Sequence, residues 1–148
     1  MVEIMSQMNE QEILKLPKNI RQIGLPEEKK KIYVEDYVVT YMNQLAAEYS
    51  NQQVAAILLG SYAKQKDTRL TFIHGAIGLP TAKVEDDQVI FDSSLWENIY
   101  NTMRQFFGKG EIVGWFLTRP GKSLGINEKI TKIHVDQFPG KDKTLLLM

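Results

Sequence analysis

The sequence contains no cysteine. This absence excludes disulfide bonds, thiolate nucleophiles, and zinc or iron–sulfur sites built on cysteine. It fits a reducing compartment, and we expect a cytoplasmic protein. No apolar run approaches the roughly 20 residues that a membrane-spanning helix needs, and the acidic, interrupted N-terminal segment does not resemble a signal peptide. We therefore expect a soluble chain without membrane contact.

An excess of one charge is also missing. Lys and Arg together number 18, Asp and Glu together number 18, and the formal net charge is zero. A balanced chain has no overall attraction for nucleic acid, so nucleic-acid binding is disfavoured. The 148 residues are 43% hydrophobic and 24% charged, which is typical of one soluble globular domain.

The two ends of the chain differ from its middle. Residues 1–30 contain two prolines, a charge cluster and scattered apolar residues, and we expect an N-terminal arm that is partly flexible or lies on the domain or on a neighbour. The domain is expected at residues 31–148. Its last apolar run, residues 143–148, continues to the final residue, which suggests a chain cut from a longer one.

Alternating apolar and polar residues, continuous apolar runs and the turn residues that separate these segments predict strands and helices in mixed order. The residues 54–59 form a continuous apolar run before Gly60, typical of a strand buried on both faces. The strands are expected at 31–35, 54–59, 69–77, 89–91, 111–116 and 143–148.

Three helices are expected between these strands. Asp36 is placed to cap the first, Ser94 and Glu97 form a capping box for the second, and Asn127 can cap the third. The buried face of the second helix is predicted to carry Trp96, Ile99, Tyr100, Met103 and Phe107, and that of the third Ile126, Ile130 and Ile133.

Three local strings resemble the MPN/JAMM (JAB-type) family. Residues 55–60 (AAILLG) resemble the family's "GLLLG" strand, and residues 75–80 (GAIGLP) resemble its "naFplP" strand exit. Residues 112–121 (IVGWFLTRPG) are similar to its "vvGWYHtHPG" signature. The resemblance covers residues 31–148. It implies a single α/β domain with a mixed, cytidine-deaminase-like sheet flanked by helices.

Active members of this family hold zinc with two histidines and an aspartate, and use a glutamate as general base and a serine beside the reacting carbonyl. Carried onto this chain, the positions of the two histidines are Leu117 and Arg119, fixed on both sides by Gly114-Trp115 and Pro120-Gly121. Leucine has no lone pair, and arginine is a permanent cation that repels zinc.

The other positions have changed as well. The base falls on Gln53, the serine on Asn127 and the aspartate on Ile130. The resemblance therefore implies a degenerate member without catalytic residues, metal or cofactor. Two interpretations of Arg119 are open: it pairs with Glu128 or Asp136 and so orders residues 120–125 without zinc, or it is an exposed loop arginine.

Two histidines, a Gly-Lys-Ser string and three serines are the other candidate site residues. His74 and His134, with acidic neighbours such as Asp136 and Glu128, leave open a metal-dependent hydrolase with a rebuilt site, although a structural or surface histidine is favoured for each. The Gly121-Lys122-Ser123 string lacks the earlier glycine of a phosphate-binding loop, because that position is Phe116. Ser61, Ser94 and Ser123 lack the Gly-x-Ser-x-Gly context of a serine hydrolase.

Two functions are compatible with this sequence. The favoured one is a zinc-free, non-catalytic MPN-like protein-interaction or scaffolding domain, a pseudoenzyme that pairs with itself or with another MPN-like domain. The alternative is the hydrolase rebuilt around His74 and His134.

Overall fold

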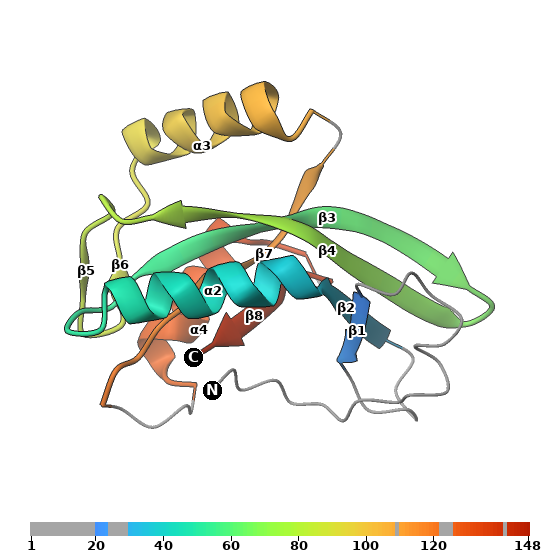
Figure 1. Ribbon diagram of the computed structural model, residues 1–148, viewed down its shortest axis with the longest axis horizontal. Helices are drawn as coiled ribbons and strands as arrows, with labels where there is room; N and C mark the ends of the chain where they lie inside the picture. Colours follow the sequence, from blue (N-terminus) through green and yellow to red (C-terminus); the bar gives the residue numbers. More distant parts are fainter. Residues whose placement is uncertain (1–19, 24–29, 109, 122–125, 141) are drawn as a thin grey trace.

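The computed structural model describes residues 20–23, 30–108, 110–121, 126–140 and 142–148. Within these residues, eight strands and three helices follow one another in mixed order (Figure 1). The strands are β1 Ile20–Ile23, β2 Lys30–Glu35, β3 Ala55–Gln65, β4 Thr68–Leu79, β5 Val84–Glu85, β6 Gln88–Val89, β7 Glu111–Leu117 and β8 Thr144–Leu147. The helices are α2 Asp36–Glu48, α3 Ser93–Phe106 and α4 Glu128–Gln137.

Six strands form one mixed sheet in the order β1-β2-β4-β3-β7-β8. β3 pairs antiparallel with β4 and β7, whereas β2 joins β4, and β8 joins β7, in parallel. α2 packs on one face of the sheet, and α3 and α4 pack on the other. The predicted α/β fold, a mixed sheet flanked by helices in a single domain, is confirmed.

β3 is the strand around which the core is built. Ala55, Ile57 and Leu59 point into the cluster formed with α3 and α4, whereas Ala56 and Leu58 point into the cluster formed with α2. All five are at most 1% exposed, as expected for an apolar run with a helix layer on each face. The strand does not end at Gly60: it continues with polar residues to Gln65 in a long hairpin with β4 that Figure 1 shows reaching beyond α2.

The helix caps are partly as predicted. Asn127 caps α4, since its side chain accepts from the backbone N–H of Ile130. Asp36 does not cap α2: it is the first helical residue, after Glu35. Likewise Asp92, and not Ser94, caps α3 by accepting from the N–H of Leu95. The helix begins at Ser93, so Ser94 already lies inside its first turn, and Asp92 holds the N-cap position from which a side chain reaches the free amides.

The predicted buried faces of α3 and α4 are confirmed except at their edges. Ile99, Ile130 and Ile133 are buried in the core, but Tyr100 is 48% exposed and Ile126 is 60% exposed. Leu95 takes the buried place on α3 that Tyr100 was expected to fill. Tyr100 lies beside the buried stripe of α3, next to Ile99, whereas Ile126 precedes the N-cap residue Asn127 and so lies outside α4.

The ends of the chain join the sheet. Within the expected arm, β1 pairs antiparallel with β2; the rest of residues 1–29 lies outside the described residues. β8 pairs with β7 as the predicted last strand. Within the described part of the chain, no helix combines the length and the apolar character needed to cross a bilayer.

Gly114 in β7 allows β8 to approach closely. A methyl group at this position would collide with the backbone of Thr144, including its carbonyl oxygen. We expect Gly114→Ala to lower the free energy of unfolding by about 1–3 kcal/mol, measured by urea denaturation, because β7 and β8 must separate to admit it. Gly108→Ala is the matched control: its methyl group would meet open space, and a change within about 0.5 kcal/mol is expected. Equal losses in the two variants would contradict the close approach.

Candidate functional site

A two-residue turn presents a carboxylate to the end of β7. Val84 pairs with Val89 and Glu85 with Gln88, so Asp86 and Asp87 form the tip of the β5–β6 hairpin. Their φ angles are 50° and 68°, the backbone of a type I′ turn, which aspartate tolerates. The two side chains diverge: Asp86 is exposed, whereas Asp87 is 2% exposed. The turn thus carries one carboxylate into the protein.

Asp87 forms a buried, two-point ion pair with Arg119. The guanidinium Nε donates to Oδ1 and NH2 donates to Oδ2, both at 2.9 Å. The side chains are only 3% and 7% exposed, so water screens the pair very little. Breaking one side of such a pair leaves an uncompensated buried charge.

Two amide side chains complete the shell of the Asp87 carboxylate. Gln53 Nε2 donates to Oδ1 at 2.7 Å and to the carbonyl oxygen of Thr118 at 3.0 Å, and Gln53 Oε1 accepts from the N–H of Asp87 at 2.8 Å. Asn127 Nδ2 donates to Oδ2 at 2.8 Å. The carboxylate therefore accepts four hydrogen bonds from three side chains. We call Asp87, Arg119, Gln53 and Asn127 the Asp87 network.

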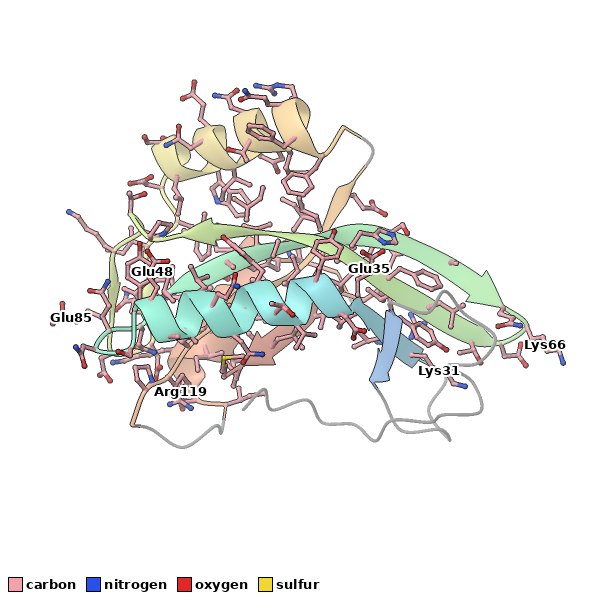
Figure 2. The ribbon with its side chains drawn as sticks, in the orientation of Figure 1. Lys31, Glu35, Glu48, Lys66, Glu85 and Arg119 are labelled. Atoms are coloured by element: carbon pink, nitrogen blue, oxygen red, sulfur yellow. The ribbon has the colours of Figure 1, made fainter. Side chains whose placement is uncertain are left out.

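The elements that hold the Asp87 network are locked to one another. The N–H of Thr118 donates to Val54 O at 3.0 Å, and the N–H of Val54 donates to Thr118 Oγ1 at 2.8 Å. The N–H of Arg119 donates to Met148 O at 2.8 Å. The start of β3, the exit of β7 and the end of β8 thus meet beside Arg119, which Figure 2 shows far from Glu35 at the start of α2.

The environment of Asp87 favours its ionised form. Burial raises the pKa of the carboxyl, but the hydrogen bonds from its three side-chain partners and the charge of Arg119 outweigh burial. The pKa of Asp87 therefore lies below its ordinary value, and the carboxylate stays charged in the folded protein at neutral pH.

The five positions implied by the family resemblance divide into two groups. Gln53, Arg119 and Asn127 come together around Asp87. Leu117 and Ile130 are fully buried and belong to the apolar cluster of α3 and α4. Asp87 supplies the carboxylate that Arg119 was expected to find in Glu128 or Asp136.

This set of side chains does not fit a zinc ion. Zinc needs lone pairs from neutral imidazole, carboxylate or thiolate. Arg119 offers only donors and a permanent positive charge, and Leu117 offers no lone pair. The oxygens of Asp87 already accept from four N–H groups. Among the residues that the structure describes, no group of three or more His, Cys, Asp or Glu side chains could hold a metal.

The two histidines have separate partners. His134 Nδ1 accepts from the indole N–H of Trp115 at 2.9 Å, and partial burial lowers the pKa of His134, which favours the neutral imidazole. His74 lies on β4 with Ser61 at 3.0 Å from Nε2 and Glu35 at 3.4 Å from Nδ1.

Removing one side of the ion pair tests its place in the fold. Asp87→Asn and Arg119→Met should each lower the free energy of unfolding by about 3–5 kcal/mol, and the double variant should lose less than the sum, because neither charge is then left alone. The neighbouring pair Asp86–Lys129, with side chains 69% and 51% exposed, is the matched control: Asp86→Asn should cost at most about 1 kcal/mol. Additive losses in urea denaturation would contradict the coupling.

The lowered pKa of Asp87 predicts a pH dependence. A carboxyl with a lower pKa in the folded state contributes fully to stability above its ordinary value of about 4, and the contribution is lost as the pH falls through the folded-state pKa. The stability gap between the wild type and Asp87→Asn should therefore narrow on acidification, because protonated Asp87 resembles asparagine in charge. A gap that stays constant in urea denaturation from neutral to acidic pH would contradict this.

Comparison with known proteins agrees with this geometry. No curated protein matches the chain. The family model described as JAB1/Mov34/MPN/PAD-1 ubiquitin protease matches residues 27–136, well over half of the chain. The match includes the strands β2 to β7, the β5–β6 hairpin and the Asp87 network. The chain belongs to the JAB/MPN domain family.

Proposed function

We propose that this protein is a zinc-free JAB/MPN domain, non-catalytic as a metalloprotease, that acts as a protein-interaction or scaffolding module. The observation that carries the proposal is the buried Asp87–Arg119 ion pair, which lies where the resemblance places a metal ligand and the general base. An ion pair at this place neutralises internally the charge that would otherwise attract a metal ion.

The chemistry of the Asp87 network supports the absence of metalloprotease activity. A general base must accept a proton from water, but an uncharged amide such as Gln53 does not do so near neutral pH. Both ends of the Gln53 amide are also engaged, with Asp87 and with Thr118. Asn127 is held in the same way, by Asp87 and by the first turn of α4.

The surfaces of the helices support the binding half of the proposal. Large apolar side chains are exposed on each of them: Tyr37 on α2, Tyr100 and Phe106 on α3, and Val135 on α4. The outer side of α4 also carries a groove between Ile126, Val135 and polar neighbours. A second copy of this chain or another MPN-like domain is the partner we propose for these helices.

The alternative, a hydrolase rebuilt around His74 and His134, receives no support from the contacts of the two residues. The half-buried His134 is bonded to Trp115, and His74 contacts Ser61 and Glu35 on the sheet. A joint metal site would need at least one further ligand near both imidazoles.

Metal content and cleavage test the non-catalytic half of the proposal. We expect the purified full chain to contain no stoichiometric zinc by elemental analysis, to show the same melting temperature with zinc or with chelator, and to leave an isopeptide-linked ubiquitin dimer intact. A zinc-loaded, active metalloprotease assayed on the same ubiquitin dimer is the positive control. One zinc per wild-type chain together with cleavage would overturn the proposal.

Light scattering over a range of concentrations, on the same preparation, tests the choice of partner. A concentration-dependent dimer weakened by Phe106→Ser or Val135→Ser would support self-association. A monomer at every concentration would exclude the second copy as partner.

A further inference from the structure

A serine, a histidine and a glutamate lie in a chain of contacts on the sheet, away from the Asp87 network. Ser61 Oγ is 3.0 Å from His74 Nε2, and His74 Nδ1 is 3.4 Å from Glu35 Oε1. The three residues come from β3, β4 and the end of β2. Figure 2 shows Glu35 where β2 passes into α2, far from Arg119.

The strand register places the three side chains on one face. Phe72 is opposite Tyr33 on one side and opposite Ser61 on the other, so these three share a face. Because side chains two residues apart on a strand point the same way, Glu35 and His74 follow Tyr33 and Phe72 onto that face. Each of the three side chains therefore contacts the next one from an adjacent strand.

A β-bulge sets the position of His74. Gly60 pairs with Ile73 and Leu59 pairs with Gly75, so His74 is the additional residue between the two pairs. A bulge re-aims the side chain of the additional residue and is frequent beside active sites. Gly60 itself allows the strands to approach, since a methyl group there would collide with the Phe72 carbonyl group.

The contacts have the order found in an activated nucleophile. A carboxylate that accepts from Nδ1–H fixes the imidazole in the tautomer whose Nε2 has a free lone pair, and that lone pair can accept the hydroxyl proton of the serine. We infer that Ser61 is a nucleophile for acyl transfer from activated esters, with His74 as its general base and Glu35 as the positioning residue for the imidazole.

The three side chains are accessible from solvent, and aromatic rings line one side of them. The side chain of His74 is 46% exposed, whereas that of Glu35 is 18% exposed, so the base faces solvent and the carboxylate lies deeper. Phe72 stacks on His74, and Tyr33 stacks on Phe72. Phe107, at the end of α3, lies over the neighbouring Gly75. These rings favour an ester with an aryl or short acyl group over a charged one.

Tyr37 holds Glu35 from the side of α2. Burial raises the pKa of the Tyr37 hydroxyl, and the charge of Glu35 and a hydrogen bond to it raise that pKa further. The tyrosine thus stays protonated and donates to the carboxylate. The hydrogen bond from Tyr37 therefore helps to hold Glu35 in its orientation toward His74.

The reaction balances with the ester and water alone. Ser61 Oγ forms a bond to the acyl carbon while its proton moves to His74 Nε2; the bond from carbon to the leaving oxygen then breaks, and His74 returns the proton to the leaving group. Water repeats the sequence on the acyl-serine and releases the acid. A phenol is the leaving group we expect, because its oxygen carries negative charge readily and therefore needs little assistance from the proton that His74 returns. The inference is independent of zinc and goes beyond the proposed binding function.

Covalent labelling of the full chain tests the inference. A fluorophosphonate forms a P–O bond to an activated serine with loss of fluoride, and peptide mass spectrometry locates the adduct. We expect Ser61 to be labelled at least about 100-fold faster than the exposed Ser94 of the same chain, and His74→Gln to slow Ser61 by a similar factor, because a positioned general base contributes about 10²–10⁴-fold. Hydrolysis of p-nitrophenyl acetate should fall in parallel in Ser61→Ala and stay unchanged in Ser94→Ala.

The role of Glu35 has a separate readout. Glu35→Ala should move the ¹⁵N chemical shifts of His74 away from the Nδ1–H tautomer and slow the labelling of Ser61, with the melting temperature as the check on folding. A folded wild-type chain with no adduct on Ser61, or one labelled at the same rate in His74→Gln, would overturn the inference.

Discussion

A carboxylate can stay ionised inside a protein only when donors surround it, and Asp87 depends on this condition. It accepts four hydrogen bonds, from Gln53 just before β3, Arg119 just after β7 and Asn127 at the N-cap of α4. These residues are distant in sequence, so the network fastens separate parts of the fold to one another. The ionised Asp87 therefore contributes both to the stability of the domain and to the balance of charge at its site.

The contrast between the two groups of family positions has a physical basis. Leu117 and Ile130 adjoin the apolar cluster of α3 and α4, so aliphatic side chains there add to the core. Arg119, Gln53 and Asn127 face Asp87 instead, where polar side chains must each find a partner. The two groups of positions are thus stabilised differently: by apolar packing on one side and by a hydrogen-bond network on the other.

Much of the fold could be predicted from the sequence because its signals are local. The apolar run of β3 needs two covered faces, and Gly114 in the string before Arg119 is placed where β8 passes closest. Asp87 could not be predicted in the same way. It lies in a turn between strands of two residues each, too short for periodicity, and its role depends on Arg119, which is 32 positions away in the sequence. The adjacent Asp86-Asp87 pair was the available signal for a type I′ turn.

The Ser61–His74–Glu35 contacts were hidden for a similar reason. The sequence around Ser61 lacks a nucleophile motif, and only the bulge at His74 and the order of β2, β4 and β3 bring the three side chains together.

The turn at the tip of the β5–β6 hairpin restricts what position 87 can be. Its left-handed backbone is accessible at low cost only to glycine, asparagine and aspartate, so the longer glutamate is disfavoured by conformation before its reach is considered. The guanidinium opposite requires an anion, which glycine and asparagine do not provide. The two demands have one common solution among the twenty amino acids, so a chain that keeps both this hairpin and Arg119 has no neutral substitution available at residue 87.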